Sequence, residues 1–189
     1  MVIIPGVGDN RNDHQLRTLS EALARSGVVV MDMTTPTLMH RDLSPVDGDA
    51  VVRAFERLSQ WPGVAPDRVG IFGISAGDAL ACLAAASPAI RDRVTFLMLF
   101  GGFYDARTLL RDFGRRALVV DQIRAPVYLL HDRTDQYVPF TESREFDAAL
   151  TQFGHPHSYA ELGIFQHVYV RLSAASAARC TTARASSPS

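Results

Sequence analysis

The sequence predicts an α/β fold: a mostly parallel sheet of about six strands, with helices on both faces. Short apolar segments alternate along the chain with longer segments whose apolar residues recur every three or four positions. The short segments are apolar without alternation, which is typical of strands buried on both faces of a parallel sheet. In such sheets functional residues gather beyond the carboxyl ends of the strands, so polar residues at those ends are the candidates for a site.

Six strands are expected where apolar, often β-branched residues run together. Each of these runs is closely followed by glycine, proline or polar residues. The expected strands are residues 2–4, 28–33, 68–74, 95–100, 126–131 and 158–161.

Helices are expected between these strands. Residues 12–25 place Leu16, Leu19 and Leu23 on one helical face, with Asn12 or Asp13 as the N-cap. The other expected helices are centred on residues 51–58, 77–86, 141–153 (with Thr141 as N-cap) and 168–178, and residues 34–46 are expected to form a loop.

Composition indicates an ordinary globular domain. The 189 residues are 47% apolar and 21% charged, and the net charge is −1, which favours neither nucleic acid nor an acidic membrane surface as partner. No apolar run is long enough to cross a bilayer, and the N-terminal residues lack the features of a secretory signal. Cys82 and Cys180 form neither a disulfide framework nor a metal cluster, so a cytoplasmic location is expected. Residues 1–178 are predicted to form one domain, and residues 179–189 a disordered tail.

One serine lies between two glycines, at the point where an expected strand meets an expected helix. The stretch is Gly73-Ile74-Ser75-Ala76-Gly77. The glycines permit a tight turn in which the serine projects outward, and the following helix begins with a backbone N–H that can face a developing oxyanion. A plain glycine-rich turn would explain the glycines but not the serine at its tip.

A nucleophilic serine needs a general base, and the base needs an orienting acid. Asp135 comes later in the chain than Ser75 and follows the strand at 126–131. His167 comes later still and follows the last expected strand. Three parallel strands would therefore bring the three side chains to one edge of the sheet.

These segments resemble those of the α/β-hydrolase superfamily. The resemblance rests on the turn GISAG, the acid loop HDRTDQYVP and the late FQH, and it spans roughly residues 2–178. It implies that Ser75 is the nucleophile, Asp135 the acid and His167 the base. Two positions depart from the family pattern: Asp132 stands where glycine is usual, and Asp78 stands where a small residue is common and would place a negative charge near Ser75.

The resemblance also implies an oxyanion hole and a substrate pocket. The backbone N–H groups of Val7 and Ala76 are the expected oxyanion donors, and Phe103 and Tyr104 are expected to line the pocket. Asp105, which follows the preceding strand, is an alternative acid.

Relative to that family, the sheet begins two strands late, which makes residues 28–33 an edge strand. An apolar edge invites pairing, so we expect it to be buried in a homodimer or covered by residues 34–46. The segment between Phe100 and Val127 is short, which leaves little room for a lid.

The sequence therefore predicts a carboxylesterase that cleaves small, short-acyl esters through an acyl-enzyme, with no cofactor or metal. Two alternatives stay open: a hydrolase of small peptides, amides or lactones that uses the same three residues, and a non-catalytic binding protein. Histidines 155 and 157 are expected in a solvated loop, although two such residues can also begin a metal site, and His131 is expected to be a buried, hydrogen-bonded residue.

Overall fold

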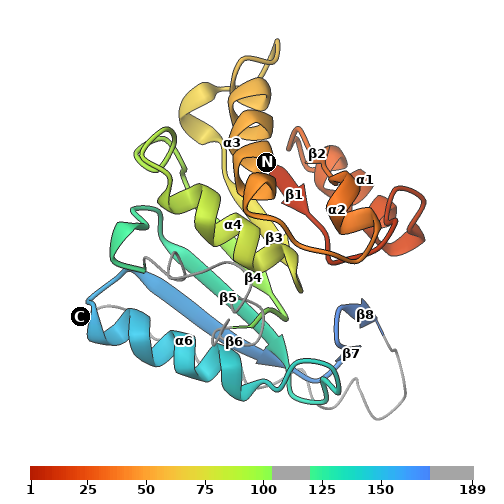
Figure 1. The fold of residues 1–189 in the computed structure, drawn as a ribbon, viewed down its shortest axis with the longest axis vertical. Coiled ribbons are helices and arrows are strands. Elements are labelled where there is room, and N and C mark those ends of the chain that lie inside the picture. The colour runs from red at the N-terminus through yellow and green to blue at the C-terminus, as the bar shows by residue number, and fades with distance from the viewer. Residues whose placement is uncertain (104–119, 171–189) are drawn as a thin grey trace.

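The computed structural model describes residues 1–103 and 120–170, and within them six parallel strands form one sheet in the order β2-β1-β3-β4-β5-β6 (Figure 1). The strands are β1 (Val2–Ile4), β2 (Met31–Asp32), β3 (Ile71–Ile74), β4 (Leu97–Phe100), β5 (Val127–Asp132) and β6 (His157–Leu162). The predicted α/β class and strand number are confirmed. Beyond β6 the chain forms a separate antiparallel hairpin of β7 (Phe165–Gln166) and β8 (Tyr169–Val170).

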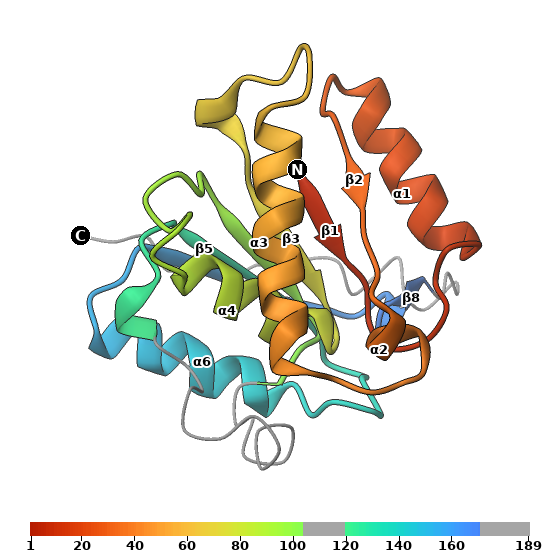
Figure 2. The ribbon, with the colours of Figure 1, turned by 45° about the horizontal axis from the view of Figure 1, so that its top comes forward.

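Helices cover both faces of the sheet, as predicted (Figure 2). The helices are α1 (His14–Arg25), α2 (Pro36–Met39), α3 (Pro45–Ser59), α4 (Gly77–Ala86) and α6 (Thr141–Gln152), with 3-10 turns at Pro66–Arg68 and Val120–Gln122. Helices α3, α4 and α6 pack on one face, and α1 packs on the other.

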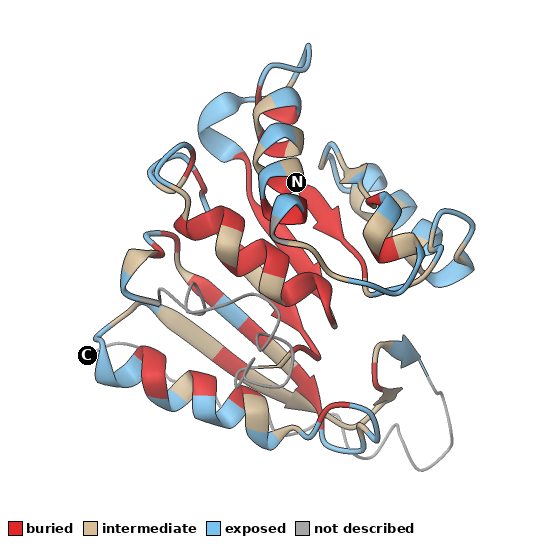
Figure 3. Cartoon of the chain, in the orientation of Figure 1, coloured by how far each residue is buried: buried red, intermediate tan, exposed pale blue. Residues whose placement is uncertain are grey.

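Each strand contributes side chains to the hydrophobic core on both faces of the sheet, because successive side chains along a strand point to opposite sides. In β1, Val2 and Ile4 belong to the core under α3, α4 and α6, whereas Ile3 belongs to the core on the α1 face. All three side chains are fully buried. Burial is uneven between the helices: eight residues of α4 are buried, but none of α1 is, and the apolar face of α1 is only partly covered (Figure 3).

Three expectations about individual elements are wrong. The strand expected at 28–33 is only two residues long, because its sole partner β1 is itself short and pairs only Val2 and Ile3 with it. Residues 34–46 contain the four-residue helix α2, whose N-cap Thr35 accepts a hydrogen bond from the Leu38 N–H. The N-cap of α6 is Phe140 rather than Thr141.

The helix expected at 168–178 is also contradicted where the structure describes it. Tyr169 and Val170 pair as strand β8 with Gln166 and Phe165, so the chain turns back at residues 167–168. This pairing is a tight hairpin with a two-residue turn, which the apolar spacing read as helical did not indicate. Residues 171–178 and the predicted tail at 179–189 lie outside the described residues.

None of the helices in the described ranges has the length and apolar composition that crossing a membrane requires.

Candidate active site

Ser75 lies in a tight turn between β3 and α4, at the carboxyl edge of the sheet. Its φ angle is 56°, a left-handed conformation that is uncommon outside glycine. The turn is held on both sides: the Ser75 N–H donates to the Phe100 carbonyl at 2.8 Å, and the Asp78 N–H donates to the Ser75 carbonyl at 3.0 Å. The strained backbone is therefore stabilised by neighbouring backbone and aims the serine away from the strand.

Glycines allow other backbone segments to approach this turn. A Cβ on Gly77 would overlap the carbonyl oxygens of Ile4 and Pro5, so α4 packs directly on the end of β1. A Cβ on Gly6 would lie 3.2 Å from the Ser75 Cβ. The loop that follows β1 therefore lies against the serine.

His167 reaches Ser75 from the β7–β8 hairpin. It occupies the first position of the two-residue turn and has a φ of 57°, as such turns require. Its Nε2 lies 2.8 Å from the Ser75 Oγ, and its Nδ1 lies 2.6 Å from the Asp135 Oδ2. The structure thus brings together the three side chains that the sequence singled out.

The side chain of Asp135 is buried, and both of its carboxylate oxygens have partners. Its side chain has no exposed surface. Oδ1 accepts hydrogen bonds from the N–H groups of Tyr137 at 2.8 Å and Val138 at 2.9 Å. Oδ2 faces His167 and also lies 3.3 Å from the Nε2 of His131. The carboxylate therefore has a fixed orientation toward the His167 ring.

His131 contacts the same carboxylate oxygen of Asp135 as His167 does. It is fully buried, and its Nε2 lies 3.0 Å from the Val138 carbonyl, which can only accept, so Nε2 carries the hydrogen. Its Nδ1 lies 2.7 Å from the Ser143 Oγ and accepts from that hydroxyl. Burial lowers the pKa of His131, which favours the neutral ring that these bonds require. The expectation of a buried, hydrogen-bonded histidine is confirmed.

Asp132, the residue in a usual glycine position, is fully buried beside His131. Its Oδ1 accepts from the N–H of Thr134 at 2.8 Å and from the Thr134 hydroxyl at 2.6 Å. Its Oδ2 accepts from the N–H of Phe165 at 2.8 Å. The carboxylate therefore joins the loop that carries Asp135 to the hairpin that carries His167.

Asp78 is buried beneath the serine turn. Burial raises the pKa of its carboxyl well above the ordinary value, despite hydrogen bonds from the N–H groups of Phe100 and Gly102. Burial thus favours the neutral acid rather than the negative charge that the sequence suggested. A Cβ on Gly102 would overlap this carboxyl, so the strand end and the acid pack directly against each other.

The expected oxyanion donors lie on either side of Ser75. Ala76 directly precedes α4, and Val7 directly follows Gly6, which contacts the serine. Within residues 1–103 and 120–170, neither the Val7 N–H nor the Ala76 N–H donates to a protein acceptor.

The predicted pocket residues are only partly described. Phe103 is half-buried just beyond β4, whereas Tyr104 and the alternative acid Asp105 lie outside the described residues. An aromatic residue that the sequence did not single out, Tyr137, lies beside the site: its ring centroid is 5.5 Å from that of His167, and 71% of its surface is exposed. Only its place in the acid loop could have suggested it.

An apolar cavity of about 390 Å³ lies on the α1 face of the sheet, next to the site. Gly6 and Val168, which neighbour Ser75 and His167, form part of its wall. Most of the remaining wall consists of apolar side chains from α1 and the strands, among them Leu16, Leu19, Met98, Leu130 and Phe165.

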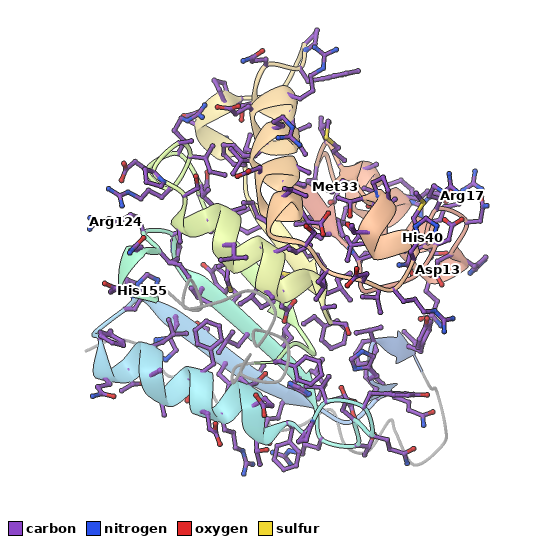
Figure 4. All side chains as sticks on the ribbon, viewed as in Figure 1. Asp13, Arg17, Met33, His40, Arg124 and His155 are labelled. Atoms are coloured by element: carbon purple, nitrogen blue, oxygen red, sulfur yellow. The ribbon has the colours of Figure 1, made fainter. Side chains whose placement is uncertain are left out.

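The remaining histidines of interest lie away from this edge. His157 begins β6, and His155 precedes it with its Nε2 2.8 Å from the Ala125 carbonyl. Figure 4 shows His155 near Arg124, at the amino ends of β5 and β6. Since Ser75 follows the carboxyl end of β3, these histidines lie at the opposite edge of the parallel sheet. In the described part of the chain, no three His, Cys, Asp or Glu side chains are arranged to hold a metal ion.

No protein-family model matches the sequence. The chain is similar to the uncharacterized peptidase YtmA of Bacillus subtilis (strain 168), with 26% identity over 154 residues. That match covers 69% of this chain and 59% of the peptidase, so the chain spans little more than half of its relative.

Many solved structures are similar to this chain in fold. A puromycin-hydrolyzing peptidase of Mycobacterium tuberculosis superposes with a TM-score of 0.73 and 20% identity, over 90% of this chain and 31% of that one. Est1E of Butyrivibrio proteoclasticus, solved with ferulic acid bound, superposes with a TM-score of 0.71 and 16% identity, over 89% of this chain and 80% of that one. At these identities the likeness concerns the fold.

Proposed function

Since the chain has the α/β-hydrolase fold, we propose that it is a serine hydrolase that cleaves small, short-acyl carboxylic esters. Ser75 is the nucleophile, His167 the general base and Asp135 the acid that orients the base. The observation that carries the proposal is the pair of hydrogen bonds made by His167, at 2.8 Å to Ser75 and 2.6 Å to Asp135.

The proposed reaction follows from the tautomer that these bonds select. Asp135 accepts the Nδ1 hydrogen, which leaves the Nε2 lone pair of His167 to take the Ser75 proton. The serine oxygen attacks the ester carbonyl, and the N–H groups of Val7 and Ala76 stabilise the resulting oxyanion. His167 then protonates the leaving alcohol, and an acyl-enzyme remains on Ser75. Water, activated by His167, releases the acid and restores the serine.

The short-acyl preference rests on the limited chain available for a cap. The segment between Phe100 and Val127 suffices for one helix and its connections, and a lidless site favours small soluble esters over long-chain lipids.

A fluorophosphonate probe tests the nucleophile directly. We expect the wild type to be labelled and Ser75→Ala to remain unlabelled, because only an activated serine attacks the probe. A folded wild-type sample that stays unlabelled would contradict the proposal and favour a binding protein. A series of p-nitrophenyl esters then tests the acyl preference. An optimum at long chains would contradict the short-acyl proposal and would place the acyl chain in the apolar cavity.

Hydrolysis of small peptides or amides by the same residues is the second candidate, favoured by the two similar proteins that are named as peptidases. Aminoacyl p-nitroanilides and the matching p-nitrophenyl esters distinguish the two functions. Turnover of the esters without turnover of the anilides supports the esterase. Turnover of the anilides at a rate comparable to that of the esters supports the peptidase.

A further inference from the structure

We propose that Asp132 is a positioning residue, which sets His167 at its working distance from Asp135 and Ser75 by tying the β7–β8 hairpin to the end of β5. Its effect on activity rests on the proposed serine hydrolase function, but its effect on the geometry of His167 does not.

The tie is short, and the carboxylate at its centre is buried. Both carboxylate oxygens of Asp132 are used, Oδ1 by Thr134 and Oδ2 by the N–H of Phe165, which is distant in the chain. The Thr134 hydroxyl also lies 3.0 Å from the Phe165 carbonyl, so both backbone groups of Phe165 face this pair of side chains. Thr134 directly precedes Asp135, and Phe165 is separated from His167 only by Gln166. One carboxylate therefore spans the two segments whose relative position defines the His–Asp hydrogen bond.

The hairpin has few other buried attachments among the described residues. It contains only two residues in each strand, and an isolated hairpin of that size is unstable in water. Apart from the bonds of His167 itself and those of Phe165 to Asp132 and Thr134, the side-chain hydrogen bonds of the hairpin are exposed. They join Gln166 to Gln136 at 3.2 Å, and the Val170 N–H to Gln15 at 3.1 Å. Apolar contact adds to these bonds, since the Phe165 ring meets the Phe100 ring edge-on at 5.0 Å. Aromatic packing alone allows small sliding movements, whereas a buried carboxylate must keep its donors.

His131 performs the matching task on the other face of β5. Adjacent strand residues point to opposite sides, so His131 holds the acid loop through Val138 and Asp135, while Asp132 holds the hairpin. The last two residues of β5 thus hold the segments of Asp135 and His167 in place through separate contacts. Each segment carries one partner of the 2.6 Å hydrogen bond between His167 and Asp135, so the length of that bond depends on the position of both segments.

The test uses Asp132→Asn, whose carboxamide keeps the size of the side chain but has a single acceptor oxygen. It can satisfy the donors on Thr134 or the Phe165 N–H, but not both, and its amide hydrogens face donors. Asp47→Asn is the control, because Asp47 is also buried and also uses both carboxylate oxygens, but it lies at the start of α3. Asp47 accepts from the Ser44 N–H at 2.7 Å and the Thr37 hydroxyl at 2.5 Å, whereas Asp132 accepts from two N–H groups and one hydroxyl. Thr134→Val and Thr134→Ser form a second pair that leaves the carboxylate in place.

Fluorophosphonate labelling rate is the first measurement. We expect Asp132→Asn to label roughly 10- to 100-fold more slowly than the wild type, because small misplacements of a reacting group cost rate of that order. Asp47→Asn should stay within about threefold of the wild type, and Thr134→Ser should label faster than Thr134→Val. In a His167→Ala background, adding Asp132→Asn should change the residual rate by less than about twofold, since Asp132 acts through His167.

The low-field proton signal of the His167 Nδ1–H is the second measurement, and it needs no activity. We expect this signal in the wild type and in Asp47→Asn, and its loss in Asp132→Asn. Equal labelling of Asp132→Asn and Asp47→Asn would overturn the proposal, as would further slowing in the His167→Ala background. If the wild type is not labelled at all, the proposed function fails, and the proton signal alone decides: its retention in Asp132→Asn overturns the positioning role, and its loss supports it.

Discussion

The two sides of the site are held by different kinds of interaction. On the serine side, β3 and α4 meet through close backbone approach, at positions where Gly77 leaves no room for a side chain. On the base side, the acid loop and the β7–β8 hairpin are held through buried side chains of β5, namely His131 and Asp132. The serine is therefore fixed by close backbone packing and backbone hydrogen bonds, and its partners by hydrogen bonds from buried side chains.

The two kinds of support fail differently. A collision between a new side chain and backbone atoms is relieved only by moving a whole helix or strand. It therefore lowers the stability of the entire fold. A lost hydrogen bond leaves one buried group unpaired and lets one loop move, so it acts on stability and geometry locally. Substitutions on the serine side should thus cost stability first, and substitutions on the base side should cost activity first.

Gly77→Ala should have the largest effect on stability. The added Cβ overlaps the carbonyl oxygens of Ile4 and Pro5, which belong to the inner strand β1 and the residue that follows it, so we expect a loss of about 3 kcal/mol or failure to fold. Gly48→Ala is the control: it lies in α3, its Cβ would meet the Leu83 Cβ at 3.7 Å, and alanine favours a helix by about 1 kcal/mol. Chemical denaturation of both variants measures the difference, and equal stability would refute the steric account.

His131→Gln should weaken the base side next. It replaces a ring that contacts Ser143, Val138 and Asp135, and we expect a stability loss of about 1–2 kcal/mol. Labelling by the fluorophosphonate should slow about tenfold, because Asp135 loses a neighbour that fixes it. Ser143→Ala, which removes only the hydroxyl on Nδ1, should slow labelling less. A His131 variant that is destabilised but labels at the wild-type rate would show that the ring supports the fold alone.

Asp78→Asn should change stability in a pH-dependent way. The folded pKa of Asp78 is raised above its unfolded value, so its contribution to stability is complete below about pH 4 and is lost as pH rises toward the folded pKa. Asparagine resembles the neutral acid and has no such loss. The free energy of unfolding of the wild type, relative to the variant, should therefore fall as pH increases above about 4. Thermal unfolding across pH checks this, and a difference independent of pH would mean that the carboxyl does not change charge on unfolding in that range.

Val29→Lys should have the smallest effect on stability and should act on assembly instead. We propose that the edge at residues 28–33 pairs with a second copy of the chain, since Val29 is 42% exposed beside the outermost strand β2. The lysine should convert a dimer to a monomer with stability unchanged within about 0.5 kcal/mol. Val46→Lys, an exposed position on α3, is the control and should remain dimeric. Light scattering that finds a monomeric wild type would refute the dimer.

Several features of the site could be predicted from the sequence, because they depend on local patterns or on the order of the strands along the chain. Ser75 lies between a strand and a helix that both occur where expected, and α4 spans residues 77–86 as predicted. Asp135 and His167 were found because each follows a parallel strand, and such strands end at one edge. The last helix was mispredicted because Tyr169 and Val170 pair with Gln166 and Phe165 in a tight hairpin instead of continuing as a helix.

What the sequence determined by itself is therefore the layered fold and the three residues at its carboxyl edge, because both depend on the alternation of segments and on chain order. Only the tertiary structure decided how those residues are held. In the sequence, Asp132 was only a residue at a position where glycine is usual, and Asp78 was only a negative charge expected near Ser75. Their partners, the N–H groups of Phe165 and Phe100, are distant from them in the chain. Burial and hydrogen bonds over such separations arise from packing, and no local pattern encodes them.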